Sequence, residues 1–135
     1  MAIQWTPALS VGNDAIDAQH RELFRRADAL LAAVAGDARS RRLGEVIQYL
    51  HAYAVEHFGL EEAWMRERHF QGYVRHKVEH DRFIADLVML ADELERGKDG
   101  GFMASRVNAW LGEWLVKHVA GTDQEMTAFL NLKSA

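Results

Sequence analysis

The chain has no cysteine and a single proline, and both absences limit what it can be. Without cysteine it forms no disulfide, no thiolate nucleophile and no cysteine-based zinc or iron–sulfur site. Pro7 precedes every helical pattern, so nothing after it forbids long helices. No run of about 18 apolar residues occurs, and we therefore expect no membrane-spanning helix.

Basic residues are too scattered for a nucleic-acid surface. The 135 residues carry a net charge of −4, with acids and bases interspersed, and no basic face of the kind that binds nucleic acid results. The densest basic run, residues 39–42, is interpreted as a solvated loop and helix start. The N-terminus lacks the basic and apolar regions of a signal peptide. We therefore expect a soluble, cytoplasmic protein.

Apolar residues recur at helical spacing in four segments, which predicts an all-α fold. The segments span about residues 17–34, 40–64, 73–94 and 103–118. Gly36 and Gly97 are interpreted as stop signals. Short connections make neighbouring helices antiparallel, so we expect an up-down-up-down four-helix bundle with an irregular N-terminal arm and a short C-terminal helix. We expect residues 1–135 to form a single domain and a monomer.

Five histidines and two carboxylates interrupt the apolar stripes of these helices. They are His20, His57, Glu61, His76, His80, His118 and Asp123. Their positions along an up-down-up-down bundle all fall at the same end. Imidazole costs free energy to bury without a partner, and it is the commonest protein ligand for transition metals. A metal site explains both the burial and the clustering.

The spacing within helices fits this interpretation. His57 and Glu61 are four residues apart, as are His76 and His80, so each pair lies on one helical face. One histidine on an apolar stripe is usually a hydrogen-bonded core residue, but that alternative does not suit five histidines with two acids at one end of a bundle.

The remaining spacing needs a break in the fourth helix. Asp123 follows His118 by five residues, which a regular α-helix would rotate off the shared face. We expect Gly121 to end or loosen this helix and residues 122–125 to form a capping box that opens the tail helix.

His51, on another face, and His69, in a predicted loop, are interpreted as surface residues.

Five imidazoles exceed the needs of one ion, so the sequence predicts two. Imidazole suits iron, zinc, copper and nickel, and carboxylates add hard oxygen ligands that can bridge. With two six-coordinate irons, the histidines, two bridging carboxylates and one bridging oxo or hydroxo group fill all positions but one. The last position would be open to a small ligand such as O₂.

With these residues in place, the chain resembles the hemerythrin family, specifically its single-domain bacterial members. The matching segments are Ile16–His20, His57–Met65, His76–Phe83 and Trp114–Asp123, and Trp5 with Leu9–Gly12 is similar to the family's opening. The resemblance implies that His76, His80 and His118 bind one iron, that His20 and His57 bind the other, and that Glu61 and Asp123 bridge them.

The resemblance also implies a function. The family binds O₂ reversibly at this non-heme di-iron centre, which indicates an oxygen carrier, store or delivery protein, with an O₂-consuming enzyme as a partner, and not an enzyme itself. Leu115, three residues before His118, and Val119, directly after it, are expected to form an apolar wall beside the open position. The alternative is that both are ordinary core residues.

Two other functions stay open at this point. A ferritin-like di-iron oxidase uses the same bundle, but its ligands come from glutamates and Glu-x-x-His motifs, and no such motif lies on a core stripe here. A sensor of O₂, nitric oxide or peroxide would need a separate partner, because no signalling domain is fused to the bundle.

Overall fold

The protein is a bundle of α-helices, seen here in a computed structural model that describes residues 4–35, 40–96 and 100–134. The helices are α1 (Asp14–Ala35), α2 (Ser40–Glu67), α3 (Tyr73–Glu95), α4 (Gly100–Lys117) and α5 (Gln124–Ser134). A 3₁₀ turn, η1 (Pro7–Leu9), lies in the N-terminal arm, and a π-helical segment, η2 (His118–Asp123), joins α4 to α5. The described residues contain no strand. The predicted all-α bundle is confirmed.

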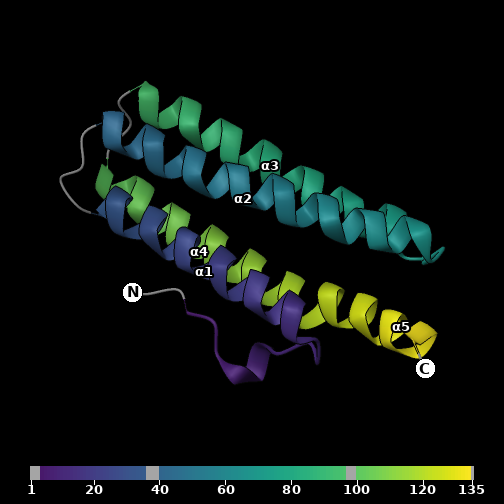
Figure 1. The fold of residues 1–135 in the computed structure, drawn as a ribbon. Coiled ribbons are helices and arrows are strands. Elements are labelled where there is room, and N and C mark those ends of the chain that lie inside the picture. Colours follow the sequence, from purple (N-terminus) through teal and green to yellow (C-terminus); the bar gives the residue numbers. More distant parts are fainter. Residues whose placement is uncertain (1–3, 36–39, 97–99, 135) are drawn as a thin grey trace.

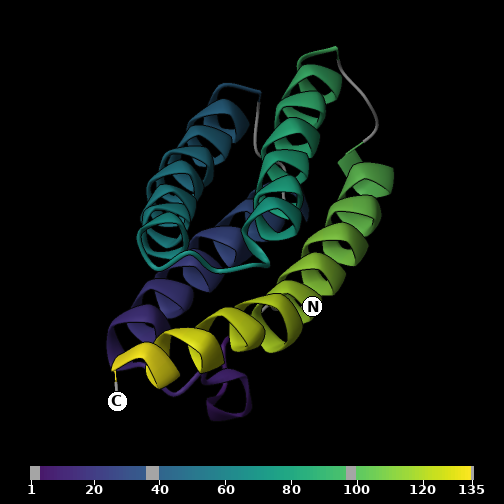
Figure 2. The same cartoon turned by 90° about the vertical axis from the view of Figure 1, so that its right-hand side faces the viewer.

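The four long helices pack side by side with alternating directions (Figure 1). Close backbone contacts join α1 to α2, α2 to α3, and α1 to α4, whereas α3 and α4 approach each other less closely. The tail helix α5 leaves the line of α4 beyond η2 (Figure 2). Within the described part of the chain, no helix is both long enough and apolar enough to span a membrane.

Three helix ends differ from the expected positions: α1 begins three residues early, α4 also begins early, and α2 ends three residues later. The side chain of Asn13 explains the early start of α1, because its Oδ1 accepts a hydrogen bond of 3.0 Å from the backbone N–H of Ile16. Asparagine in this position caps a helix N-terminus. Gly36 and Gly97, the predicted stop signals, lie outside the described residues.

Apolar side chains form two separate clusters along the bundle. The main cluster draws on all four long helices and includes fully buried Leu30, Leu50, Leu87 and Leu111. The smaller cluster lies toward the other end and consists of Val11, Ile16, Met65, Met126 and Leu130. Each fully buried leucine contributes about 1.5–3 kcal/mol relative to exposure. Between the two clusters, α1, α2, α3 and η2 carry buried polar residues.

The turn between α2 and α3 packs against the smaller apolar cluster through Phe70. His69, exposed in this turn as the sequence predicted, adopts a left-handed backbone with φ of 55°. The next residue, Phe70, places its ring 4.9 Å from that of Phe129 in α5, measured between centroids. Gly72 lies against Phe70, where an added Cβ would approach ring carbons to 2.7 Å. The turn therefore has room for glycine alone at this position.

Two alanine substitutions test this packing with opposite expected signs. Gly72→Ala should lower the free energy of unfolding by about 1–3 kcal/mol, because the methyl group displaces Phe70 from Phe129. Gly59→Ala, on an exposed face of α2 where a Cβ meets nothing within 4 Å, should raise it by about 0.5–1 kcal/mol through helix propensity. Urea unfolding measures both. Shifts of the same sign would contradict the assigned packing.

Candidate metal centre

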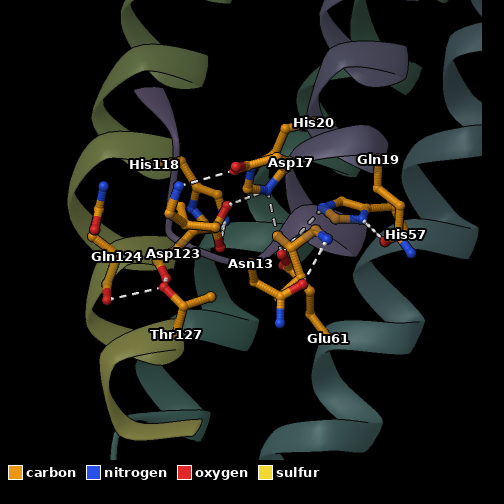
Figure 3. A network of polar contacts seen from close by, with 12 residues as sticks. Asn13, Asp17, Gln19, His20, His57, Glu61, His118, Asp123, Gln124 and Thr127 are labelled. Carbon is orange, nitrogen blue, oxygen red and sulfur yellow. Dashed lines mark hydrogen bonds and ion pairs between the residues drawn. The ribbon is translucent and has the colours of Figure 1, made fainter. Parts of the chain in front are cut away.

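The polar residues between the two apolar clusters are the seven that the sequence singled out. They comprise His20 on α1, His57 and Glu61 on α2, His76 and His80 on α3, and His118 and Asp123 on η2. Each is at most 2% exposed. Figure 3 shows members of this cluster on different helices pointing toward one another.

Three of the imidazoles meet one oxygen from each carboxylate. His80 Nε2 lies 3.1 Å from Glu61 Oε1, while His76 Nε2 and His118 Nε2 lie 3.0 Å and 3.2 Å from Asp123 Oδ1. His80 and His118 also bring their Nε2 atoms to 3.2 Å of each other. We call His76, His80 and His118 the three-histidine group.

The other two imidazoles meet the opposite oxygens. His57 Nε2 lies 3.1 Å from Glu61 Oε2, and His20 Nε2 lies 3.0 Å from Asp123 Oδ2. We call His20 and His57 the two-histidine group. Each carboxylate thus turns one oxygen to each group, which is the arrangement of a bridging ligand. In each half, the atoms that could hold a metal ion all lie within 4.8 Å of one another.

The donor atoms at the centre lack ordinary partners. Both oxygens of Glu61 and Asp123, and the Nε2 atoms of His20, His57 and His76, are buried without a hydrogen-bond partner among the described atoms. Buried polar atoms nearly always have partners, and an unsatisfied one costs about 1–3 kcal/mol. A set of imidazole nitrogens and carboxylate oxygens suits iron. These residues therefore fit a pair of metal ions.

The charges at the centre shift its protonation equilibria. Burial alone would lower the pKa of His20, but the neighbouring carboxylates of Asp123 and Glu61 outweigh it and raise this pKa to about 9. Burial also opposes the charge on His118, yet Asp123 raises the pKa of His118 to about 10. The pKa of Asp123 falls below its usual range, because His118 and His20 outweigh burial and the nearby Glu61. A metal ion binding here must displace protons from imidazole.

Three of the histidines are each oriented by a side chain from a neighbouring helix. The Nδ1–H groups of these imidazoles donate to carbonyl or carboxylate oxygens. The bonds are His57 to Gln19 Oε1 at 2.6 Å, His80 to Glu62 Oε2 at 2.9 Å and His118 to Glu79 Oε1 at 2.9 Å. With Nδ1 carrying the proton, Nε2 is free to bind a metal.

These three orienting residues are not among those predicted from the sequence. Gln19, Glu62 and Glu79 are each adjacent in sequence to a member of the cluster, and each bonds to a histidine of a different element. They lie off the apolar stripes, where polar residues are common and mostly solvated. A polar residue beside a stripe ligand was the available signal, and it is a weak one.

Of the two alternatives predicted at Gly121, an ended helix is wrong and a loosened helix is what the structure has. The helix continues from α4 into α5 through η2, whose π-helical turns replace a break. A π-helix bonds residue i to i+5, so its wider turn brings Asp123 back over His118. Thr122 does not open a capping box; its hydroxyl donates to Glu79 Oε1 at 2.9 Å. The sequence correctly required a departure from regular α-helix, but it predicted a capping box and did not identify the π-helical form.

Aromatic and apolar side chains enclose the imidazoles. Phe58 stacks on His80 with ring centroids 3.9 Å apart, and Trp114 stacks on His118 at 4.3 Å. Leu115 and Val119 are fully buried in the main apolar cluster, and their role beside a bound ligand stays a prediction. The other two histidines stand outside the centre, since His51 lies part-buried on α2 and His69 is exposed.

Comparison with known proteins identifies the family of the chain. The profile of the hemerythrin family, the hemerythrin HHE cation binding domain, matches residues 11–130. A bacteriohemerythrin of Ralstonia nicotianae is 35% identical, covering 95% of this chain and 88% of its own length. One of Stenotrophomonas maltophilia is 31% identical, covering 89% and 76%. The crystal structure of wild-type hemerythrin shares the fold, with a TM-score of 0.82 and 23% identity over 96% of this chain and 98% of its own. The chain belongs to the hemerythrin family and is one of its iron-binding members.

Proposed function

We propose that this protein binds O₂ reversibly at two non-heme iron ions. The observation that carries the proposal is the division of the two carboxylates, because Glu61 and Asp123 each turn one oxygen to the three-histidine group and one to the two-histidine group. Two ions bridged in this way would satisfy the buried donor atoms that have no other partner.

The ligand assignment follows from the two groups. The three-histidine group would hold one iron, the two-histidine group the other, and Glu61 and Asp123 would bridge them together with an oxo or hydroxo group. Such a pair of irons supplies the two electrons that O₂ takes up on binding and returns on release. The two-histidine group offers one imidazole fewer, and this leaves room on its side for a small ligand.

The surrounding residues support reversibility by positioning and by excluding water. Gln19, Glu62 and Glu79 hold imidazole rings in a fixed orientation, which favours metal affinity. Leu115 and Val119, both fully buried beside His118, keep water and protons away from the centre in this proposal. The apolar shell around a metal site controls solvent access.

The donor set supports a carrier over an oxidase. Five neutral imidazoles with two carboxylates leave the centre less negatively charged than a carboxylate-rich one, so very high oxidation states of a bound metal are less favoured. The described residues place no Glu-x-x-His pair in the cluster. We therefore rank reversible binding above oxidation.

The direct test is iron content together with a visible spectrum. Protein from iron-replete cells should contain about two irons per chain, as the double carboxylate bridge requires. After reduction, it should gain a visible band in air and lose it again when O₂ is removed. One metal per chain, or zinc alone, would contradict the two-iron centre. Rapid oxidation without a reversible band would favour an oxidase.

Histidine variants test the ligand assignment. His118→Ala should lose most of its iron, because it removes a buried donor of the three-histidine group and leaves neighbours unpaired at about 1–3 kcal/mol each. His69→Ala is the matched control, since His69 is exposed and outside the cluster. Iron per chain is measured after the same dialysis for both variants. Equal retention would refute the role assigned to His118.

Paired leucine variants test the apolar wall. Leu115→Ala and Leu111→Ala both shorten a fully buried leucine of the main cluster, and each should cost about 2–5 kcal/mol of stability. Leu115 lies one turn from His118, so only its variant should speed the decay of the O₂-dependent band. Thermal unfolding and band decay are measured together. Equal decay in the two folded, iron-loaded variants would remove Leu115 from the wall.

A further inference from the structure

A cavity of about 420 Å³ opens between α3 and α4 and reaches the metal centre from the side. It lies along the seam where these helices approach least closely. Its lining includes Glu79 and Arg82 of α3, Trp110 and Trp114 of α4, and His118. The volume is within the range of about 300–1,000 Å³ that small-molecule sites occupy. A small ligand here would lie beside one of the proposed iron ligands.

Trp114 connects this cavity to the centre. Its ring stacks on His118 with centroids 4.3 Å apart and planes 12° from parallel. The same indole forms part of the cavity wall. A π-system that touches both a bound ligand and an iron-binding imidazole offers an electron a short path between them. Trp110 adds a second aromatic surface, which lies against Phe83 at 5.2 Å.

One cation in the lining of the cavity has no acidic partner among the described residues. Glu79 already accepts hydrogen bonds from His118 and Thr122. Lys117 is paired with Glu113 at 2.7 Å. Arg82 forms no ion pair within the described part of the chain, and its guanidinium suits phosphate or carboxylate. The cavity therefore favours a ligand that is both planar aromatic, for the indoles, and anionic, for Arg82.

We propose that this cavity is the electron entry site of the protein, where a planar anionic reductant of the reduced-flavin-phosphate class binds and Trp114 carries its electron to His118. The inference rests on the proposed function, because a carrier that relies on ferrous iron needs a way to reduce iron left oxidised. In each encounter the flavin hydroquinone gives up one electron, releases one proton to solvent and becomes a semiquinone, while one ferric ion becomes ferrous. A second encounter reduces the other iron, and no bond between donor and metal forms.

Binding is tested first, with flavin mononucleotide and the iron-loaded, oxidised protein in a calorimetric titration. Arg82→Gln should weaken binding about tenfold, because a charge-assisted contact to the phosphate is lost. Arg68→Gln, which alters an exposed cation outside the cavity, should bind like the parent. Riboflavin, which lacks the phosphate, should be insensitive to the change at Arg82. Equal affinity of Arg82→Gln and the parent for flavin mononucleotide would overturn the proposed site.

Electron transfer is tested by mixing reduced flavin mononucleotide with the oxidised protein without air and following the loss of ferric absorption. At saturating flavin, Trp114→Leu should slow reduction about tenfold or more. Trp110→Leu removes a cavity wall that does not stack on His118, so it should weaken binding and leave the saturated rate unchanged. An unaltered saturated rate in iron-loaded Trp114→Leu would overturn the path.

The two proposals fail separately. If Trp114→Leu does not retain iron, Arg82→Gln still tests the entry site, because the side chain it alters is exposed. At low flavin concentration, the rate at which this variant is reduced should fall in step with its weaker flavin binding. Normal flavin binding and reduction in a protein without a reversible O₂ band would reject the carrier function and keep the entry site. If the O₂ band is reversible but Arg82→Gln and Trp114→Leu bind flavin and are reduced by it as the parent is, the entry site is rejected and the carrier function is kept.

Discussion

The burial of two carboxylates between the two apolar clusters is the constraint on which the rest of the structure depends. An ionised carboxylate costs several kcal/mol to bury unless charges and hydrogen bonds compensate it, and Glu61 and Asp123 are both at most 1% exposed. Five imidazoles from four elements surround them, so every long helix must present the correct face at the same height. The apolar clusters on either side then shield the charges from water and make each contact stronger than it would be at the surface.

The orienting hydrogen bonds join neighbouring helices into a series. Gln19 of α1 holds a histidine of α2, Glu62 of α2 holds one of α3, and Glu79 of α3 holds one of η2. A displacement of one helix therefore turns an imidazole on the next. By contrast, the Nδ1 atoms of His20 and His76 have no hydrogen-bond partner among the described residues. The imidazoles are thus held unequally, and the three-histidine group contains both that are held by a carboxylate.

Periodicity and topology explain what could be predicted from sequence. Helical spacing identified the four long helices, and antiparallel packing then placed seven polar stripe positions at one level. The orienting residues could not be found in this way, because side chains such as Glu62 leave the stripe and reach a partner through tertiary packing. The contact of Trp114 with His118 could not be predicted either, because it also depends on tertiary packing. A tryptophan on an apolar stripe is normally interpreted as an ordinary core residue. In η2 the backbone forms i to i+5 hydrogen bonds in place of i to i+4 bonds, and tertiary packing around the segment selects between the two patterns.

The π-helical segment makes chain length matter more than composition between His118 and Asp123. Ala120 and Gly121 are exposed, so exchange of either residue leaves the buried donors in place. Deletion of Ala120 or Gly121 would return the segment to α-helical register and rotate the residues that follow it about the helix axis by about 100°. Asp123 would leave the centre, and the buried face of α5 with Met126 and Leu130 would turn toward solvent. Homologous chains with the same centre are thus free to vary in sequence here but not by insertion or deletion.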